Sequence, residues 1–277
     1  MKEENAASWE EFETIFHRIE GFRQRAHEQS GVGVSDLLYR GQADSRWRLE
    51  TTLERSVSKP VSLNEYYGLI NQAKARIETF TDKSWKIPTF KKYLKWLQSD
   101  PATPSLYDAY EYFIYLRHHG FPSPLLDWTA SPYVAAFFAM DKPARDVQSV
   151  SVYVFWECTG VAKLTEHGKP EICGLGPNVK SHRRHFLQQS HYTISTALTG
   201  EDKEYAKHED AFGNRVVVQD LLWKINIPIS ARPEFLAKLH KMNINSFSLF
   251  ATEDSLLETL ATDIFALNRI DVTTRAI

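Results

Sequence analysis

Three short segments of the sequence place charged or hydrogen-bonding side chains among apolar residues. The first is Tyr39-Arg40-Gly41, in which an arginine follows the apolar run LLY. A guanidinium can hold a phosphate or a carboxylate through two parallel hydrogen bonds. We expect the glycine to let the backbone turn tightly beside it. Arg40 is therefore a candidate for binding an anionic group, and a structural salt bridge is the alternative.

The second segment, RHHGFPSPLLDWT, covers residues 117–129 and carries two histidines, a serine and an aspartate. Its prolines exclude a regular helix and make the loop rigid, and binding groups concentrate on loops that a rigid scaffold positions. His118 and Asp127 are the candidates here. The alternative is that Asp127 or Thr129 is the N-cap of a helix beginning near Pro132.

The third segment, HRRHFLQQSHY, covers residues 182–192. It sets cationic side chains beside Gln188, Gln189 and Tyr192. These groups could hydrogen-bond a ribose or stack on a planar ring. A solvated basic loop is the alternative interpretation.

A basic and aromatic stretch, KSWKIPTFKKYLKWLQS, covers residues 83–99 and contains no acid. Cations that follow a phosphate backbone, beside rings that stack on bases, are typical of single-stranded nucleic acid binding. The candidate nucleic-acid-binding residues are Lys86, Lys91, Lys92, Lys95 and Trp96. The alternative is an amphipathic helix with its lysines outward and its aromatic residues in the core.

The elements that must position these side chains follow from periodicity and turn residues. Apolar residues three and four apart predict a helix over 8–29, which Ser8 and Glu11 begin as a capping box. Further helical segments are predicted at 63–97, 106–116, 133–140, 231–242 and 253–270. Strands are predicted at 34–41, 149–156, 194–196, 222–227 and 247–250. Because helices and strands interleave without a regular βαβ order, the expected class is α+β.

Composition limits the class of protein. The 277 residues are 43% hydrophobic, which suffices for one large domain or two small ones and excludes a disordered chain. A formal charge of -2 means that any anionic partner must be held by a local patch. Cys158 and Cys173 lack the spacing of a zinc site, so we expect reduced thiols and no metal. With no secretory signal and no apolar run near 20 residues, we expect a cytoplasmic protein with no membrane partner.

Several common enzyme signatures are missing from the sequence. It contains no GxxxxGK, GxGxxG, GxSxG or HExxH, which removes most support for the usual ATP, dinucleotide and hydrolase classes. A nuclease that uses His118 and His119 as acid and base is disfavoured. Neighbouring residues in an extended segment point to opposite sides and would not converge on one phosphate.

Four segments, taken in order, resemble the successive signatures of the FRG-domain family, which is named for an F/Y-R-G tripeptide. They are LYRGQADSRWRLETTLER, LRHHGFPSPLLDWTASPYVAAFFA, RRHFLQQSHY and INSFSLFATEDSLLETL. The second usually reads close to QHYGxPTRLLDWT, so His118, Ser123 and Asp127–Thr129 match it. Arg117, His119, Pro124 and Ser190 depart from the family pattern. The resemblance covers about residues 35–262 and implies an N-terminal helical segment at 1–34 and an FRG domain at 35–277, with a helical, basic aromatic insertion at about 63–105.

FRG-type domains are similar, more distantly, to ADP-ribosyltransferases of the arginine-serine-glutamate class. This resemblance implies a single α+β domain with a short-stranded mixed sheet and flanking helices, and NAD as substrate. It places Arg40 at the NAD phosphates, and it places the strand containing Asp127, with the helix after it, behind the nicotinamide. In the region where the class carries its catalytic acid, this sequence has Gln188 and Gln189.

The resemblance assigns roles to ten residues. Those expected to be catalytic are Arg40, Asp127, His118 and Gln189, and those expected to bind NAD are Tyr39, Gly41, Trp128, Thr129, Gln188 and Tyr192. Arg40 would neutralise the pyrophosphate, and Asp127 would supply the negative charge that stabilises an oxocarbenium-like ribose. His118 would orient the ribose or the phosphates. Trp128 or Tyr192 would stack on the nicotinamide.

The predicted function is NAD-dependent mono-ADP-ribosylation by a bacterial toxin or anti-phage defence effector. The basic aromatic stretch favours RNA or single-stranded DNA as the acceptor, with RNA preferred, and a neutralising antitoxin protein is a further candidate partner. The alternative is a non-catalytic module that recognises a nucleotide or a partner. Both hypotheses require Arg40 and Asp127 to line one cavity of dinucleotide size.

Overall fold

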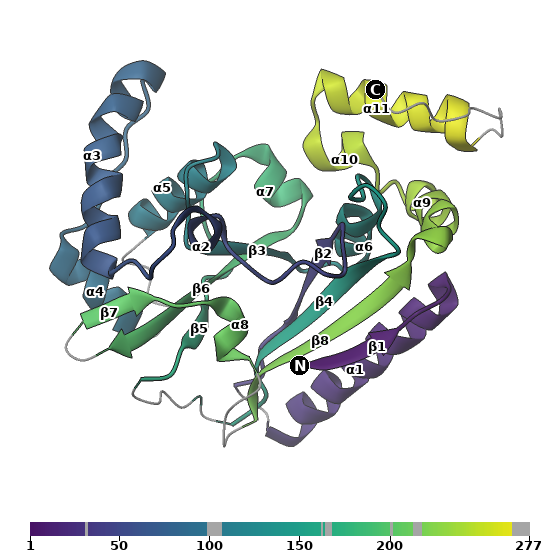
Figure 1. Cartoon of the computed structure of the whole chain (residues 1–277), viewed down its shortest axis with the longest axis horizontal. Helices are drawn as coiled ribbons and strands as arrows, with labels where there is room; N and C mark the ends of the chain where they lie inside the picture. Colours follow the sequence, from purple (N-terminus) through teal and green to yellow (C-terminus); the bar gives the residue numbers. More distant parts are fainter. Residues whose placement is uncertain are drawn as a thin grey trace.

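The computed structural model describes residues 1–30, 33–98, 107–161, 163, 168–199, 202–212 and 218–267. A single sheet runs through the described chain in the order β1-β8-β4-β2-β3-β6-β5, and β7 pairs with β6. β1 and β8 are parallel, and the other pairs are antiparallel. Helices gather at both ends of this open mixed sheet (Figure 1). The predicted mixture of helices with a mixed sheet is confirmed.

The strands are β1 (Lys2–Asn5), β2 (Leu37–Gln42), β3 (Leu125–Thr129), β4 (Ser149–Cys158), β5 (Glu171–Gly174), β6 (Ser190–Thr199), β7 (Asp202–Tyr205) and β8 (Gln219–Pro228). The helices are α1 (Trp9–Ser30), α2 (Thr52–Ser56), α3 (Leu63–Thr81), α4 (Phe90–Gln98), α5 (Tyr107–His118), α6 (Pro132–Met140), α7 (Arg183–Leu187), α8 (His208–Ala211), α9 (Arg232–Lys241), α10 (Ser246–Phe250) and α11 (Glu253–Ala261). The sequence did not predict β1, β5 or β7, each of which is only four residues long.

The strand predicted at 247–250 is wrong, because these residues belong to α10. The side chain of Asn245 accepts the backbone N–H of Ser248, and the Ser248 hydroxyl oxygen accepts the backbone N–H of Asn245. This reciprocal capping box starts a helical turn, and Ala251 ends it in the left-handed region with φ 50°. Four residues are too few for their apolar pattern to distinguish a strand from a short helix.

One hydrophobic core lies between the β1-β8-β4-β2 half of the sheet and helices α1, α6 and α9. Trp9 and Phe12 of α1 pack against Phe235 of α9, with ring centroids 5.1 and 5.5 Å apart. The predicted apolar face of the first helix is the face that contributes these rings. Residues 1–30 therefore join the same sheet and core as the residues that follow them.

A second core lies between the β3-β6 half of the sheet and helices α3, α4 and α5. It is largely aromatic: Tyr93 of α4 stacks on Phe113 of α5, with ring centroids 5.8 Å apart. Tyr66 of α3 packs edge-on against Tyr205. Each half of the sheet is thus stabilised by its own set of helices, which lie on opposite sides of the molecule in Figure 1.

The two halves meet at a narrow seam. β2 pairs with β4 along its whole length, from Leu37 to Gln42, but it pairs with β3 only between Tyr39 and Thr129. Beyond that pair the ladder stops, so Arg40 and Gly41 run beside the residues of β3 that precede Thr129 without pairing with them. Backbone groups that lose ladder partners need other partners or a solvent-filled space.

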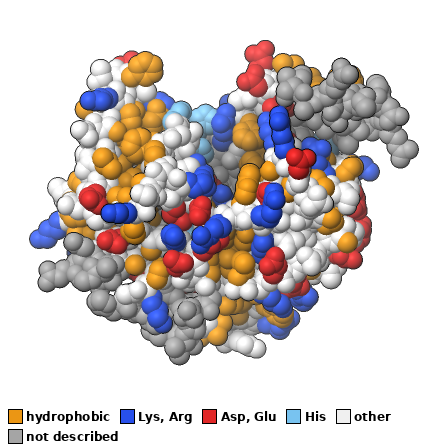
Figure 2. Space-filling model, in the orientation of Figure 1, with side chains coloured by type: hydrophobic (Ala, Val, Ile, Leu, Met, Phe, Trp, Pro, Cys, Tyr) orange, Lys and Arg blue, Asp and Glu red, His pale blue; other side chains and the backbone are white. Residues whose placement is uncertain are grey.

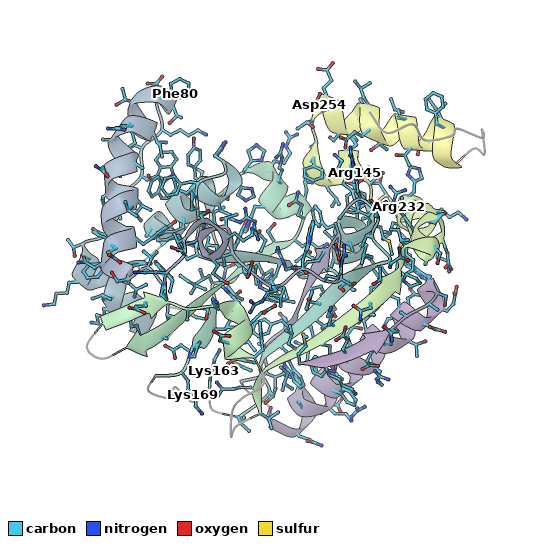
Figure 3. The ribbon with its side chains drawn as sticks, in the orientation of Figure 1. Phe80, Arg145, Lys163, Lys169, Arg232 and Asp254 are labelled. Atoms are coloured by element: carbon cyan, nitrogen blue, oxygen red, sulfur yellow. The ribbon has the colours of Figure 1, made fainter. Side chains whose placement is uncertain are left out.

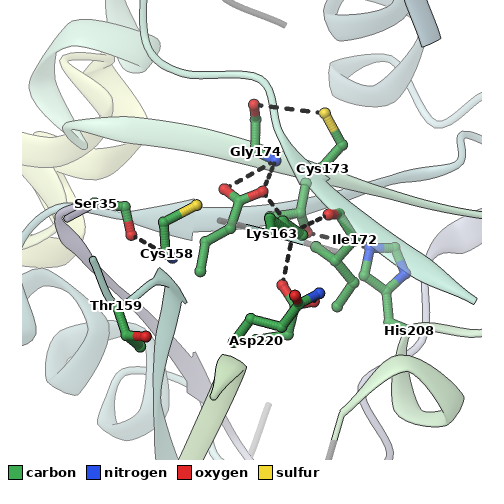
Figure 4. A network of polar contacts seen from close by, with 12 residues as sticks. Ser35, Cys158, Thr159, Lys163, Ile172, Cys173, Gly174, His208 and Asp220 are labelled. Carbon is green, nitrogen blue, oxygen red and sulfur yellow. Dashed lines mark hydrogen bonds and ion pairs between the residues drawn. The ribbon is translucent and has the colours of Figure 1, made fainter. Parts of the chain in front are cut away.

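A network of charged side chains fixes the far end of the sheet (Figure 4). The Lys163 ammonium lies 2.8 Å from Glu157 of β4 and 2.8 Å from Asp220 of β8. The Glu157 carboxylate also accepts the backbone N–H of Gly174 in β5, at 3.1 Å. Because β4 and β5 are not neighbours in the strand order, this contact curls the sheet toward itself. Cys158 and Cys173 lie in the same region and form no disulfide.

Gly41 lies within β2, so the expected tight turn beside it is wrong. An added Cβ would lie 2.0 Å from the carbonyl oxygen of Ala135 and 2.6 Å from the nitrogen of Ala139, both in α6. Only a glycine allows α6 to approach β2 this closely. The glycine of the tripeptide is therefore required by helix packing, which holds α6 against the seam.

Replacing Gly41 with alanine should lower the free energy of unfolding by about 3 kcal/mol, because the colliding atoms are backbone atoms that cannot turn away. The matched control is Gly68→Ala, a helical position where an added Cβ meets nothing within 4 Å. Gly68→Ala should raise stability by about 0.5 to 1 kcal/mol. Urea denaturation measures the free energy of unfolding of both variants. Equal stability of Gly41→Ala and Gly68→Ala would contradict the packing argument.

Candidate functional site

A cavity of about 770 Å³ opens at the seam between β2 and β3. Its volume lies within the range of about 300 to 1,000 Å³ that is usual for small-molecule and cofactor sites. All but one of the ten predicted catalytic and NAD-binding residues line it: Tyr39, Arg40, Gly41, His118, Asp127, Trp128, Thr129, Gln188 and Tyr192. The remaining lining residues are Gln42, Ala43, Trp47, Arg48, Glu50, Arg55, Arg117, Phe138 and Ser190. Gln189 does not line it.

Arg40 reaches across the seam from β2. One terminal nitrogen, Nη1, donates to the backbone carbonyl of Asp127 at 2.7 Å and lies 3.7 Å from the Asp127 carboxylate. Burial lowers the pKa of the Arg40 guanidinium, and the Asp127 carboxylate opposes that shift. The Nε atom is buried and has no hydrogen-bond partner within the described part of the chain. Arg40 thus forms the predicted structural ion pair and also contributes a cationic side chain to the cavity lining.

Asp127 lies in β3 and does not cap a helix, so that alternative is wrong. The N-cap of α6 is Ser131, whose hydroxyl accepts the backbone N–H of Val134. The Asp127 carboxylate instead forms a close ion pair with Arg117 through Oδ2, the same oxygen that lies 3.7 Å from Arg40. Two guanidiniums therefore compensate the one carboxylate that the sequence proposed as a source of negative charge.

Thr129 is not the N-cap of α6 either. Its hydroxyl donates to the backbone carbonyl of Gln188 at 2.7 Å and accepts the backbone N–H of Ser131 at 3.1 Å. The side-chain amide of Gln188 donates to the carbonyl of Leu249 at 3.2 Å. These contacts tie β3 to the turn before β6 and to α10, so both residues form the wall of the cavity.

Gln189, which was expected to be catalytic, occupies the turn itself. Its φ is 48°, in the left-handed region, and its carbonyl accepts the backbone N–H of Ala130 at 3.0 Å. The turn connects α7 to β6, and Gln189 is not among the residues that line the cavity.

His118 and Tyr192 meet at the inner end of the cavity. The His118 Nε2 atom lies 3.0 Å from the Tyr192 hydroxyl, and the His185 ring stacks on Tyr192 with centroids 5.8 Å apart. His185 Nε2 lies 2.9 Å from the carbonyl of Pro177, which can only accept, so this nitrogen carries a hydrogen. The Tyr192 hydroxyl therefore lies between two imidazoles, and its hydrogen bonds set the tautomer of His118.

The pKa of His118 is lowered, mainly because burial penalises the charged imidazolium. Arg117, His182 and His185 lower it further, and Asp127 acts in the opposite direction. A neutral imidazole at the cavity wall can accept a proton or a hydrogen bond without adding charge. This matches a positioning or proton-accepting role better than a role in charge neutralisation.

The aromatic rings expected to stack on a ligand pack against other aromatic side chains of the protein. Trp128 is 3% exposed, packs against Phe155 and donates from Nε1 to the Thr193 hydroxyl at 2.8 Å. Tyr192 is 1% exposed and packs edge-on against Tyr110. Both residues belong to the cavity lining, but each ring is almost fully buried by its neighbours. Trp47, which the sequence analysis overlooked, is 51% exposed and lines the cavity.

Two arginines of the cavity lining, Arg48 and Arg55, were not among the residues that the sequence predicted. Arg48 and Arg55 line the cavity together with Arg40 and Arg117, against two carboxylates, Asp127 and Glu50. Arg48 is paired with Glu209, at 2.6 Å, and Arg55 donates to the carbonyl of Glu50 at 2.8 Å. Both belong to the segment RWRLETTLER, whose density of arginines was the available signal. The excess of cations favours an anionic ligand.

Residues 90–98 of the basic aromatic segment form the amphipathic helix α4. Trp85 and Tyr93 are buried in the second core, with Phe90 packed against it, which is the alternative that the sequence left open. The exposed side chains are Lys86, Lys91, Lys92 and Lys95. The side chain of Trp96 lies outside the described residues. α4 lies at the end of the molecule beside α3, away from the seam (Figure 1).

No helix within the described residues has both the length and the apolar character required to cross a membrane. The same residues contain no group of three or more histidine, cysteine, aspartate or glutamate side chains arranged to hold a metal ion.

Comparison with known families tests the resemblance that the motifs suggested. Residues 35–148 match the FRG domain. The expected FRG resemblance is confirmed over this segment, which carries Arg40, Arg117, His118 and Asp127. The wall formed by Gln188 to Tyr192 lies beyond the matched residues. No curated protein and no solved structure matches this chain.

Burial of His118 predicts how stability depends on pH. Because its pKa is lowered in the folded state, the unfolded chain takes up more protons as the pH falls through the ordinary value of 6.5. The free energy of unfolding should therefore decrease from about pH 7.5 to about pH 5.5. His191 contributes in the same direction, since burial lowers its pKa as well.

Urea denaturation at several pH values measures this dependence. His118→Gln should flatten it, while His27→Gln, on the exposed side of α1, serves as the control for loss of a histidine. The interpretation of His118 is contradicted if the wild type and His118→Gln lose stability equally as the pH falls.

Proposed function

We propose that this protein is an NAD-dependent mono-ADP-ribosyltransferase with an ADP-ribosyltransferase-like fold. NAD would bind in the cavity at the seam. The observation that carries the proposal is that Arg40 and Asp127, from strands on opposite sides of the seam, line one cavity. The FRG match over 35–148 covers both residues. The enzyme class comes from the distant resemblance of FRG domains to ADP-ribosyltransferases.

The pyrophosphate of NAD would bind at Arg40. Arg40 lines the cavity, and its guanidinium would donate a charge-assisted hydrogen bond to a phosphate oxygen. Arg55 lies in the same lining, with an exposed side chain that can approach the second phosphate. The excess of guanidiniums over carboxylates compensates the two negative charges of the pyrophosphate.

The reaction breaks the bond between C1′ of the ribose and the nicotinamide nitrogen, and that electron pair leaves with nicotinamide. The acceptor's nucleophilic atom then forms a bond to C1′ and releases one proton. Asp127, held in place by Arg117, would lie beside the oxocarbenium-like ribose, and any stabilisation it gives is limited by its two ion pairs. Neutral His118 would orient the ribose or accept the released proton.

A specific observation supports a second function. The Asp127 carboxylate is compensated by two guanidiniums, and the Gln188 amide is engaged by Leu249. A site with no uncompensated carboxylate can bind a nucleotide without cleaving it. The second candidate is therefore a non-catalytic module that recognises a nucleotide or a nucleotide-bearing partner.

The proposal extends to the biological setting that the resemblance implies. The acceptor is nucleic acid, with RNA preferred, and the protein acts inside a bacterial cell as a toxin or anti-phage effector that an antitoxin could neutralise. The exposed lysines of α4 are compatible with a nucleic acid partner, although their neighbouring aromatic rings are buried.

Incubation with radiolabelled NAD and total RNA tests the enzyme directly, with label transfer and free nicotinamide as the two readouts. Wild-type protein should release nicotinamide and label the acceptor. Arg40→Lys keeps the charge but removes the planar fork, and should weaken NAD binding about tenfold or more in calorimetry. Arg25→Ala, on the exposed face of α1, is the control and should leave binding unchanged.

Three outcomes separate the hypotheses. NAD binding that depends on Arg40, without release of nicotinamide over hours, would favour the non-catalytic module. Equal NAD affinity of the wild type and Arg40→Lys would contradict both functions. Label that appears on protein and never on RNA would overturn the proposed acceptor while leaving the transferase in place.

A further inference from the structure

One exposed aromatic side chain lines the cavity, and a second lies on the short helix that leads into its wall. Trp47 is 51% exposed and belongs to the lining. Phe186 is 83% exposed on α7, which ends at Leu187, immediately before the lining residue Gln188. Aromatic rings bury large apolar areas when they find a partner, so exposed rings at a cavity mouth indicate a binding surface.

Cationic side chains accompany both rings. Trp47 lies between Arg46 and Arg48 in the sequence, and Phe186 follows Arg183 and Arg184. Figure 2 shows Lys and Arg side chains gathered over the middle of this face, with histidines in the hollow above them. A surface that combines exposed rings with cations fits a ligand with flat bases and a phosphate backbone.

The individual cations differ in how much of their charge is already compensated. Arg46 is held by Asp44 and Arg48 by Glu209, so these two mainly fix the loop around Trp47. Arg183 is exposed, and Arg184 stacks over Phe250 at 5.4 Å, with a buried Nε that has no hydrogen-bond partner in the described chain. α7 therefore offers the exposed Arg183 guanidinium to a phosphate, beside the partly exposed Arg184.

We propose that a single-stranded nucleic acid binds across the mouth of the cavity, with bases stacked on Trp47 and Phe186. Its phosphates contact Arg55 on one side and the Arg183-Arg184 pair on the other. As a statement about the acceptor, this inference rests on the proposed function. As a statement about binding, it stands on the exposed rings and cations alone.

The location follows from the chemistry of transfer. The acceptor atom must approach within about 3 to 3.5 Å of the ribose carbon that it attacks, so the acceptor must lie at the cavity. The lysines of α4 are separated from the seam by the second core, and their neighbours Trp85 and Tyr93 are buried in that core. The mouth provides both rings and cations at the place where the reaction would occur.

A folded protein acceptor fits this surface less well. Protein partners bury contiguous apolar patches with well-packed centres. Here the two exposed rings belong to separate segments, one before α2 and one on α7. Duplex nucleic acid also fits less well, because its bases are stacked inside the helix and cannot lie on side-chain rings.

Fluorescence anisotropy with labelled single-stranded RNA and DNA oligonucleotides, measured without NAD, tests the proposal. Phe186→Ala and Trp47→Ala should each weaken binding about tenfold. The matched control is Phe80→Ala: Phe80 is 90% exposed at the tip of α3, far from the cavity (Figure 3), and its loss should change nothing. A second control, Lys91→Ala with Lys92→Ala, should have at most a small effect.

The proposal is overturned if single strands bind the wild type, Phe186→Ala and Trp47→Ala equally, if only the α4 variant loses affinity, or if a duplex competes as well as a single strand. Absence of micromolar binding to the wild type would overturn it as well. Because Phe186 does not line the cavity, Phe186→Ala should retain wild-type NAD affinity in calorimetry.

This design separates the two proposals. If wild-type protein neither binds nor cleaves NAD, but oligonucleotide affinity depends on Phe186 and Trp47, the proposed function fails and the binding surface remains. If NAD is cleaved and transferred while neither ring affects oligonucleotide binding, the surface fails and the transferase remains.

Discussion

The hydrogen bond from the Arg40 guanidinium to the backbone carbonyl of Asp127 holds the site together. β2 and β3 share only the Tyr39–Thr129 pair, so the backbone beyond it has lost its ladder partners. A buried carbonyl without a partner is costly, and Arg40 supplies that partner from the opposite strand. The same residue that closes the gap in the sheet thereby brings a guanidinium to the wall of the cavity.

This arrangement depends on a separate helix-covered core for each half of the sheet, and on a third hydrophobic cluster that joins the halves through Leu38 of β2, Trp128 of β3 and Phe155 of β4. α6 packs against Gly41 on one side of the seam, while α5 ends at His118 on the other. Because each half has its own helices, the strands can diverge without exposing apolar surface. Arg117, at the end of α5, then pairs with Asp127 and fixes the carboxylate between two cations. The result is a polar cavity between two rigid walls.

The sequence predicted the elements whose pattern is long enough to be decisive. The first helix and β4 have clear periodicity, and the motifs around Arg40 and Asp127 identified both walls of the seam. What it could not predict was pairing between distant segments: β1 and β5 are recognisable only beside their partners in the sheet. Residues 247–250 form a helix because Asn245 caps it, which an apolar pattern of four residues does not reveal.

Side-chain exposure was the least predictable property of the site. Trp128 and Tyr192 were expected to face a ligand but are packed into cores, whereas Trp47 faces the cavity. Which rings are buried depends on the helices that cover each face of the sheet. A crystal structure of the protein with bound NAD or ADP-ribose tests the central claim most directly. We expect the pyrophosphate in the gap between β2 and β3, within hydrogen-bond distance of the Arg40 guanidinium; a ligand bound elsewhere, with no contact to Arg40, would contradict this account.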